Sequence, residues 1–138
     1  MRERDPIFVD SGAWIALALT SDPLHTRARE IWERVRSGGA RIFTSVPVVL
    51  ETFTFLDRNA RRDVALAWKD ALAGVRGLTV LGCDAEDLKR SWIWFRRKDL
   101  HKLSAVDAMS LTLMKRHKLP VAFAFDHHFA AVGFRVAG

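Results

Sequence analysis

The feature that most constrains the fold of this chain is a series of short apolar runs, most of them followed by a longer helical stretch. The β-favouring runs lie at residues 7–9, 41–44, 78–81, 121–125 and 134–136. They are nearly all apolar, which is typical of strands buried on both faces of a sheet. Because helical stretches separate most of them, we expect crossover connections and parallel pairing. The pattern predicts an α/β fold with a short, mainly parallel sheet of four or five strands.

The helices between these strands are predicted from their capping residues and apolar periodicity. Asp22-Pro23, Asp84 and Ser104 are typical helix starts, and Pro47 opens a further helix. The predicted helices cover residues 12–19, 22–36, 47–58, 61–73, 84–98 and 104–117. The expected element order is therefore β-α-α-β-α-α-β-α-α-β-β.

Length and composition narrow the class of protein. The 138 residues fit one domain, which we expect to span residues 1–138. One cysteine excludes a disulfide scaffold, and no apolar run is long enough to cross a membrane. The start of the chain is polar and mixed in charge, so we expect no secretory signal and a cytoplasmic location. A net charge of +6 favours polyanionic partners such as RNA.

Two aspartates close predicted strands. Asp10 follows the run at residues 7–9, and Asp126 follows the run at residues 121–125. In an open parallel sheet, ligands bind outside the carboxyl ends of the strands, so both acids point to the default site. Each could instead cap the turn or helix that follows it.

Two further acids lie on apolar helical faces. Glu51 is placed within the apolar stretch at residues 46–56, where we expect a buried helix and a carboxylate that needs a positive partner. Asp107 stands three residues after Ser104, the spacing of a capping box, yet its helical stripe continues into apolar residues. It is therefore expected both at a helix N-terminus and on an inward face.

These four acids come from four different elements and would converge at one edge of the sheet. Carboxylates brought within a few ångströms repel one another unless a cation compensates their charge. Oxygen-only ligands suit Mg²⁺ or Mn²⁺. The residues alone thus indicate a divalent metal that acts on a phosphate group, in a chain whose outer charge attracts polyanions.

The sequence resembles the PIN-domain ribonucleases, and in particular the VapC-like toxins of bacterial and archaeal toxin–antitoxin modules. Four blocks carry the resemblance, in order and at typical spacing over essentially the whole chain: residues 7–17, 44–51, 103–108 and 124–129, the last followed by Gly133-Phe134. Two positions depart from the family pattern. Gly12 and Ala124 stand where a serine or threonine is common.

The resemblance implies a PIN-like three-layer α/β/α sandwich and a metal-dependent endoribonuclease that hydrolyses RNA phosphodiester bonds. Its acidic quartet, as catalytic and metal-binding residues, carries over onto Asp10, Glu51, Asp107 and Asp126, with Mg²⁺ or Mn²⁺ as the cofactor. Ser11 falls where the family often supplies a supporting hydroxyl near the metal. The resemblance also implies a homodimer and a cognate antitoxin whose tail crosses the acidic pocket.

Basic and histidine residues complete the set of candidates. The stretch at residues 89–98 interleaves cations with aromatic side chains, a pattern of single-stranded nucleic-acid binding or of an amphipathic helix with aromatics in the core. The side chains expected to contact the RNA backbone are Arg96, Arg97, Lys98 and Lys102. His127 and His128 could act as metal ligands, but a turn or surface position is the favoured interpretation, because no third histidine or cysteine stands at zinc spacing.

The residues leave two functions open and disfavour a third. Besides the active ribonuclease, a non-catalytic RNA- or partner-binding module with a relict acidic pocket stays open. A phosphatase or receiver-like domain is disfavoured. Asp10-Ser11-Gly12 lacks the second aspartate of haloacid dehalogenase-type phosphatases, and the paired acids and late lysine of receiver domains are absent.

Overall fold

The fold is built on a five-stranded parallel sheet. The structure, a computed structural model, describes residues 5–138, so the first four residues of the polar N-terminal stretch lie outside it. The strands are β1 (Ile7–Val9), β2 (Ile42–Ser45), β3 (Leu78–Leu81), β4 (Val121–Phe123) and β5 (Arg135–Val136). Their spatial order is β3-β2-β1-β4-β5, and every neighbouring pair is parallel. The α/β prediction with a parallel sheet is confirmed.

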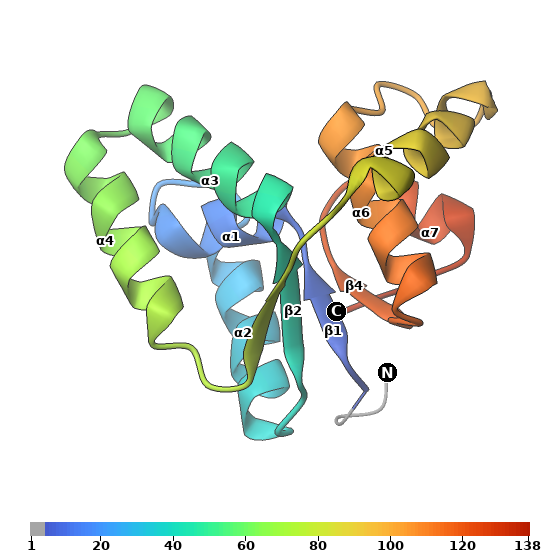
Figure 1. Cartoon of the computed structure of the whole chain (residues 1–138). Coiled ribbons are helices and arrows are strands. Elements are labelled where there is room, and N and C mark those ends of the chain that lie inside the picture. The colour runs from blue at the N-terminus through green and yellow to red at the C-terminus, as the bar shows by residue number, and fades with distance from the viewer. Residues whose placement is uncertain (1–4) are drawn as a thin grey trace.

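Helices lie on both faces of this sheet. They are α1 (Ser11–Ala18), α2 (His25–Ser37), α3 (Val46–Asn59), α4 (Arg62–Ala73), α5 (Ala85–Ser91), α6 (Ala105–Arg116) and α7 (His128–Val132), with a short 3-10 helix at Trp92–Arg96. Figure 1 shows α1 to α4 on one side of the strands and α5 to α7 on the other. This is the three-layer arrangement that a run of crossover connections produces.

The strand order places a topological switch point beside β1. From β1 the chain moves outward through β2 to β3, and it then crosses back to form β4 on the other side of β1. The amide of Asp10 donates a hydrogen bond to the carbonyl of Phe123 at 3.0 Å, which joins the ends of β1 and β4. Ligands of open α/β sheets bind in the crevice at such a point.

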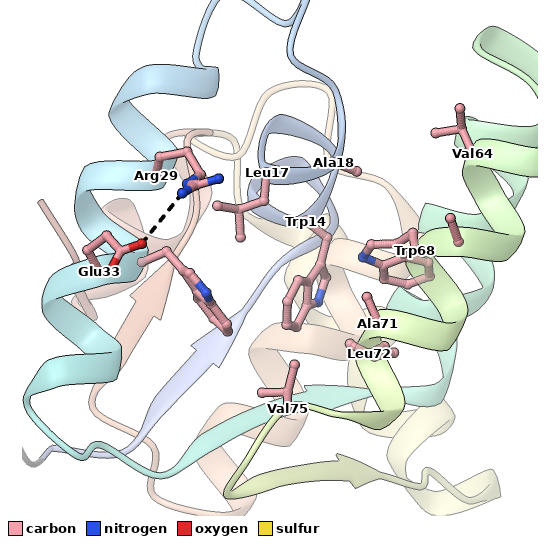
Figure 2. A pocket seen from close by; sticks show the side chains of 12 residues that line it. Trp14, Leu17, Ala18, Arg29, Glu33, Val64, Trp68, Ala71, Leu72 and Val75 are labelled. Atoms are coloured by element: carbon pink, nitrogen blue, oxygen red, sulfur yellow. Dashed lines mark ion pairs between the residues drawn. The ribbon is translucent and has the colours of Figure 1, made fainter.

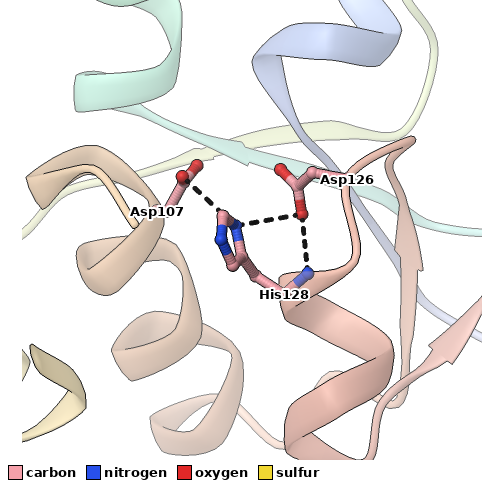
Figure 3. Close-up of side chains that lie close together, drawn as sticks. All are labelled: Asp107, Asp126 and His128. Carbon is pink, nitrogen blue, oxygen red and sulfur yellow. Dashed lines mark hydrogen bonds and ion pairs between the residues drawn. The ribbon is translucent and has the colours of Figure 1, made fainter. Parts of the chain in front are cut away.

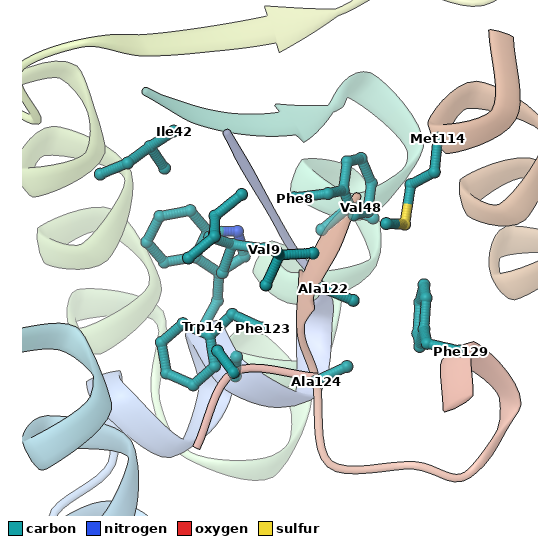
Figure 4. Packing of buried hydrophobic residues seen from close by; sticks show 14 of the residues in the cluster. Phe8, Val9, Trp14, Ile42, Val48, Met114, Ala122, Phe123, Ala124 and Phe129 are labelled. Carbon is teal, nitrogen blue, oxygen red and sulfur yellow. The ribbon is translucent and has the colours of Figure 1, made fainter. Parts of the chain in front are cut away.

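The core fills the space between the sheet and its helices. Phe8, Val9 and Phe123 are fully buried, and Figure 4 shows them among side chains from the flanking helices. One buried polar contact anchors α1 to the sheet. Trp14 Nε1 donates to Thr44 Oγ1, whose hydroxyl donates in turn to the carbonyl of Val9. This chain of bonds fixes the start of α1, and with it the position of the residue that follows β1.

Several predicted boundaries differ from the structure. The strand predicted to run to residue 125 ends at Phe123, so Asp126 lies in a loop beyond β4. Helix α2 begins at His25 rather than at Asp22, whose carboxylate instead accepts the amide of Leu24 in a turn. The helix predicted for residues 84–98 ends at Ser91 and continues as the 3-10 helix.

One element was missed altogether. The short helix α7 connects β4 to β5 and ends at Val132, and the next residue, Gly133, adopts a left-handed conformation with φ of 105°. A right-handed crossover between two parallel strands requires a connection of this kind. Within the described part of the chain, no helix is both long and apolar enough to span a membrane.

Candidate functional site

Asp10 lies at the switch point, directly after β1, as the sequence predicts. Its side chain is buried, with 3 % of the residue exposed, and its Oδ1 atom has no hydrogen-bond partner. Burial, followed by the negative charges of Asp126, Asp107 and, more weakly, Glu51, raises the pKa of Asp10 well above its ordinary value. A buried carboxylate oxygen without a partner is costly, and such atoms are rare in folded proteins.

Glu51 reaches the same region from α3. Ser11 Oγ donates a hydrogen bond of 2.5 Å to Glu51 Oε1, which holds the carboxylate next to the start of α1. Burial raises the pKa of Glu51, and the hydrogen bond from Ser11 opposes that rise. The negative charges of Asp107 and Asp126 raise the pKa further. Ser11, proposed from the resemblance as a supporting hydroxyl, therefore contacts the carboxylate that it would have to orient.

The surroundings of Glu51 differ from the expectation of a helix buried all round. The side chains that face the core from α3 are Val48, Thr52 and Leu56, whereas Leu50 is 63 % exposed. Phe55 is also exposed, and Glu51 itself is only half-buried. The prediction was wrong because one apolar face of α3 is not covered by any described part of this chain.

Asp107 combines the two roles that its spacing predicts. Its amide donates to Ser104 Oγ at 3.0 Å and its Oδ2 accepts the amide of Ser104 at 3.2 Å, which completes the capping box of α6. The same Oδ2 atom lies 3.5 Å from His128 Nδ1, so the carboxylate also faces the switch point. The cap fixes the carboxylate in place and leaves one oxygen free of protein hydrogen bonds among the described residues.

Asp126 lies across from Asp107 in the loop after β4. Its Oδ1 atom accepts the amide of His128 at 3.0 Å and lies 3.3 Å from His128 Nδ1 (Figure 3). Burial and the charge of Asp107 raise the pKa of Asp126, while the contacts with His128 oppose that rise. His128 is 4 % exposed, so the interpretation of it as a surface or turn residue was wrong. His127, by contrast, is exposed.

These acids form one electrostatic unit at the carboxyl ends of β1 and β4. The charges of Asp107, Asp126 and Glu51 raise the pKa of Asp10, and Asp107 also raises the pKa of Glu51 and of Asp126, as like charges brought close together do. The donor set is rich in carboxylate oxygens, and a buried Asp10 oxygen lacks a partner. A hard divalent cation such as Mg²⁺ or Mn²⁺ fits both facts. Metal binding by these residues stays a prediction.

The basic side chains predicted to contact RNA are exposed, but they are not equivalent. Arg97 forms an ion pair with Asp99 and donates to the carbonyl of Ala131, so part of its donor capacity is already used. No such bond is found for Arg96, Lys98 or Lys102 among the described residues. In the aromatic stretch, Trp94 Nε1 donates to Thr112 Oγ1, whereas Trp92 is 52 % exposed.

Two depressions flank the molecule. A shallow groove of about 600 Å³ runs beside Glu51 and is also lined by Leu50 and Arg58. A second groove, of about 630 Å³, lies between α1, α2 and α4. Figure 2 shows the indole rings of Trp14 and Trp68 in this second groove, with the Arg29–Glu33 ion pair at its margin. None of the four predicted acids lines the second groove.

Comparisons with known proteins agree with this architecture. The PIN domain family matches residues 7–135. The chain is 34% identical over 131 residues to the 23S rRNA-specific endonuclease VapC20 of Mycobacterium tuberculosis, in strains CDC 1551 / Oshkosh and ATCC 25618 / H37Rv. That alignment covers 93% of this chain and 95% of the relative.

A solved structure shows the same fold. The crystal structure of Mycobacterium tuberculosis VapC20, described as a Sarcin-Ricin loop cleaving toxin, superimposes with a TM-score of 0.81. Its sequence identity is 33%, and the match covers 93% of this chain and 95% of that one.

Proposed function

Because this chain belongs to the PIN domain family, we propose that it is an endoribonuclease whose acidic cluster holds Mg²⁺ or Mn²⁺ for hydrolysis of RNA phosphodiester bonds. The observation that carries the proposal is the buried, unpartnered oxygen of Asp10, which faces three other acids at the switch point. A neutralising cation is the simplest way to stabilise that arrangement.

The proposed roles follow from the contacts of each side chain. Asp10, Glu51 and Asp107 hold one ion, directly or through water, and the Ser11 hydroxyl keeps Glu51 turned toward it. The carboxylate of Asp126 assists with a second ion or orients the attacking water. Bound metal would lower the pKa of a coordinated water and offset the charge on the phosphate. No serine, cysteine or histidine nucleophile is needed.

The substrate class is RNA. The net charge of +6 attracts a polyanion, and the groove beside Glu51 carries Arg58 at its edge. We propose that Arg96, Lys98 and Lys102 contact the RNA backbone, with Arg97 as a weaker contributor because of its bonds to Asp99 and Ala131. The relative VapC20 is named for 23S rRNA and the sarcin-ricin loop, so that loop is the first RNA to test.

The purified chain is expected to cleave RNA in the presence of Mg²⁺ or Mn²⁺ and to lose all measurable cleavage in excess EDTA. The physical reason is that the carboxylates cannot neutralise developing charge on phosphate without a cation. Gel analysis of an end-labelled rRNA loop oligonucleotide measures this. Restoration of cleavage by adding metal back is the control for EDTA damage.

The same assay separates the two functions left open by the sequence. An undiminished cleavage rate in EDTA would contradict the metal mechanism. RNA binding without cleavage in either metal would instead favour the non-catalytic module with a relict pocket.

We propose two protein partners, a second copy of the chain and a cognate antitoxin. The relative of known structure is described as a toxin, which supports the antitoxin expected from the resemblance. The exposed apolar side chains Leu50, Phe55 and Ile93 support a further protein surface packed against this one.

The unaltered chain is expected to sediment as a dimer, and Leu50→Lys is expected to shift it toward the monomer. The reason is that Leu50 is 63 % exposed and a lysine there would have to be desolvated in an apolar interface. Analytical ultracentrifugation at micromolar concentration measures the effect. A wild-type monomer at every concentration would contradict the dimer.

A further inference from the structure

We propose that His128 is a metal ligand, and that its Nδ1 atom joins Asp107 and Asp126 in a mixed nitrogen and oxygen site that favours Mn²⁺ over Mg²⁺. This inference rests on the proposed function, because it assigns a further ligand and a metal preference to the same acidic centre. The sequence left a metal role for His127 and His128 open but favoured a turn or surface position, because no third histidine or cysteine stands at zinc spacing.

His128 is buried and points into the acidic cluster. It begins α7, is 4 % exposed, and its Nδ1 atom has no hydrogen-bond partner. Figure 3 shows the ring between Asp107 and Asp126, with Nδ1 3.5 Å and 3.3 Å from their respective carboxylate oxygens. A buried imidazole nitrogen is rarely left without a partner, and a cation shared with the two carboxylates would supply one.

The other ring nitrogen determines which tautomer is present when the ring is neutral. His128 Nε2 lies 2.6 Å from the carbonyl oxygen of His101. A carbonyl oxygen can only accept, so Nε2 carries the hydrogen and Nδ1 keeps its lone pair. Metal-binding histidines almost always donate their second ring N–H in this way, often to a backbone carbonyl. The lone pair is thereby aimed at the space between two carboxylates.

The distances suit ligands of one ion. Atoms bonded to the same ion at about 2.1 Å lie about 3.0 Å apart at right angles and about 3.4 Å apart at the tetrahedral angle. The two contacts of His128 Nδ1, 3.3 Å and 3.5 Å, are close to that range. The three ligand atoms all lie within 4.8 Å of one another, so a small inward movement of the two carboxylates completes the site.

An imidazole ligand changes which metal the site prefers. Mg²⁺ prefers oxygen donors and dehydrates reluctantly, whereas imidazole is a good ligand for transition metals. Adding the His128 nitrogen to Asp107 and Asp126 therefore raises the affinity for Mn²⁺ more than the affinity for Mg²⁺. A site made only from the carboxylates would lack this discrimination.

Pulsed electron paramagnetic resonance of the purified full chain loaded with Mn²⁺, without RNA, tests the ligand directly. The expected result is a ¹⁴N modulation typical of a bound imidazole, which is lost in His128→Gln and kept in His127→Gln. Glutamine can still donate to the carbonyl of His101 but has no atom equivalent to Nδ1. His127 is the matched control because it is adjacent in sequence and exposed.

A second measurement tests the metal preference. Mg²⁺ is expected to displace Mn²⁺ from His128→Gln at about one tenth of the concentration needed for the unaltered chain. If His128→Gln fails to fold, labelling the unaltered chain with ¹⁵N-histidine gives the same answer, because the modulation then changes to that of ¹⁵N.

The outcomes separate this inference from the proposed function. Binding of Mn²⁺ without nitrogen coupling would overturn the assignment of His128 as a ligand. The proposal of a nuclease that holds its metal through carboxylates would still stand. The His128 ring would then only pack beside Asp107 and Asp126 without binding the ion. Absence of any Mn²⁺ binding to the unaltered chain would overturn both.

Discussion

Asp10→Asn is expected to lower the rate of RNA cleavage by at least about 10³-fold while the chain stays folded. The amide removes one charge from the cluster and weakens the hold on the cation, and about 4 kcal/mol of lost transition-state stabilisation corresponds to that factor. Cleavage of an end-labelled oligonucleotide in saturating Mn²⁺ measures the loss. The matched control is Asp70→Asn, which changes an exposed side chain paired with Lys69 on α4.

The same variant makes a prediction about stability that distinguishes a catalytic defect from misfolding. Asp10 is buried beside Asp126 and Asp107, and their mutual repulsion is relieved when one of them becomes neutral. In EDTA at neutral pH, the melting temperature of Asp10→Asn should therefore equal or exceed that of the unaltered chain. A clear drop in melting temperature would show that Asp10 serves the fold rather than a metal.

Asp87→Asn is expected to destabilise the fold by about 2 kcal/mol. Asp87 is 2 % exposed, accepts the amide of Asp84 at 3.0 Å in the capping box of α5, and pairs with Arg116 at 2.5 Å. Removing one partner of a fully buried ion pair costs about 3–5 kcal/mol, and the cost is smaller here because the Arg116 side chain is 44% exposed. Urea unfolding followed by circular dichroism measures the difference.

The destabilisation caused by Asp87→Asn is expected to depend on pH, and its sign follows from the pKa of Asp87. Burial alone would raise the pKa of Asp87, but the bonds from Arg116 and Asp84 outweigh burial and hold it below its ordinary value. The carboxylate therefore stabilises the fold fully above the unfolded-state pKa of about 3.9, and this contribution is lost as pH falls through the lower folded-state pKa. The difference in the free energy of unfolding between Asp87→Asn and the unaltered chain should therefore disappear at low pH. As a control, Asp63→Asn removes the carboxylate of an exposed ion pair with Arg61, and it should change the free energy of unfolding little at any pH.

The strands and the acids that follow them were predictable because local sequence determines both. Three apolar, β-favouring residues before Asp10 are typical of a buried strand, and the carboxyl end of a parallel strand is where ligands bind. The capping box of Asp107 was equally local, because the spacing from Ser104 specifies it. Their convergence with Glu51 was predicted from the family resemblance and the sheet topology, not from spacing within any one segment.

What the sequence did not reveal depends on contacts between distant segments. A turn or surface position was favoured for His128 because no third histidine or cysteine stands nearby in the sequence, yet its neighbours in space are Asp107, from α6, and the His101 carbonyl. Ligands on separate elements leave no spacing signature. The available signal was Phe129 next to His128, followed by Gly133, which is the pattern of a short buried helix ending in a left-handed residue.

The exposed face of α3 was missed for a related reason. Apolar periodicity reports that Leu50 and Phe55 tend to be buried, but it does not say by what. In the structure both side chains are exposed. The apolar residues of this helix were therefore assigned to the core, although no described part of the chain packs against Leu50 and Phe55.

The switch point divides the candidate centre between two lengths of polypeptide. Asp10 and Glu51 belong to the half of the chain that builds β1 to β3, whereas Asp107, Asp126 and His128 belong to the half that builds β4 and β5. The seam between them is the β1–β4 ladder, closed by the bond from the Asp10 amide to Phe123. Neither fragment alone carries a complete set of charged groups. If the centre acts as proposed, a chain still being synthesised cannot cleave RNA until the segment that carries Asp107, Asp126 and His128 has been made and has packed beside β1.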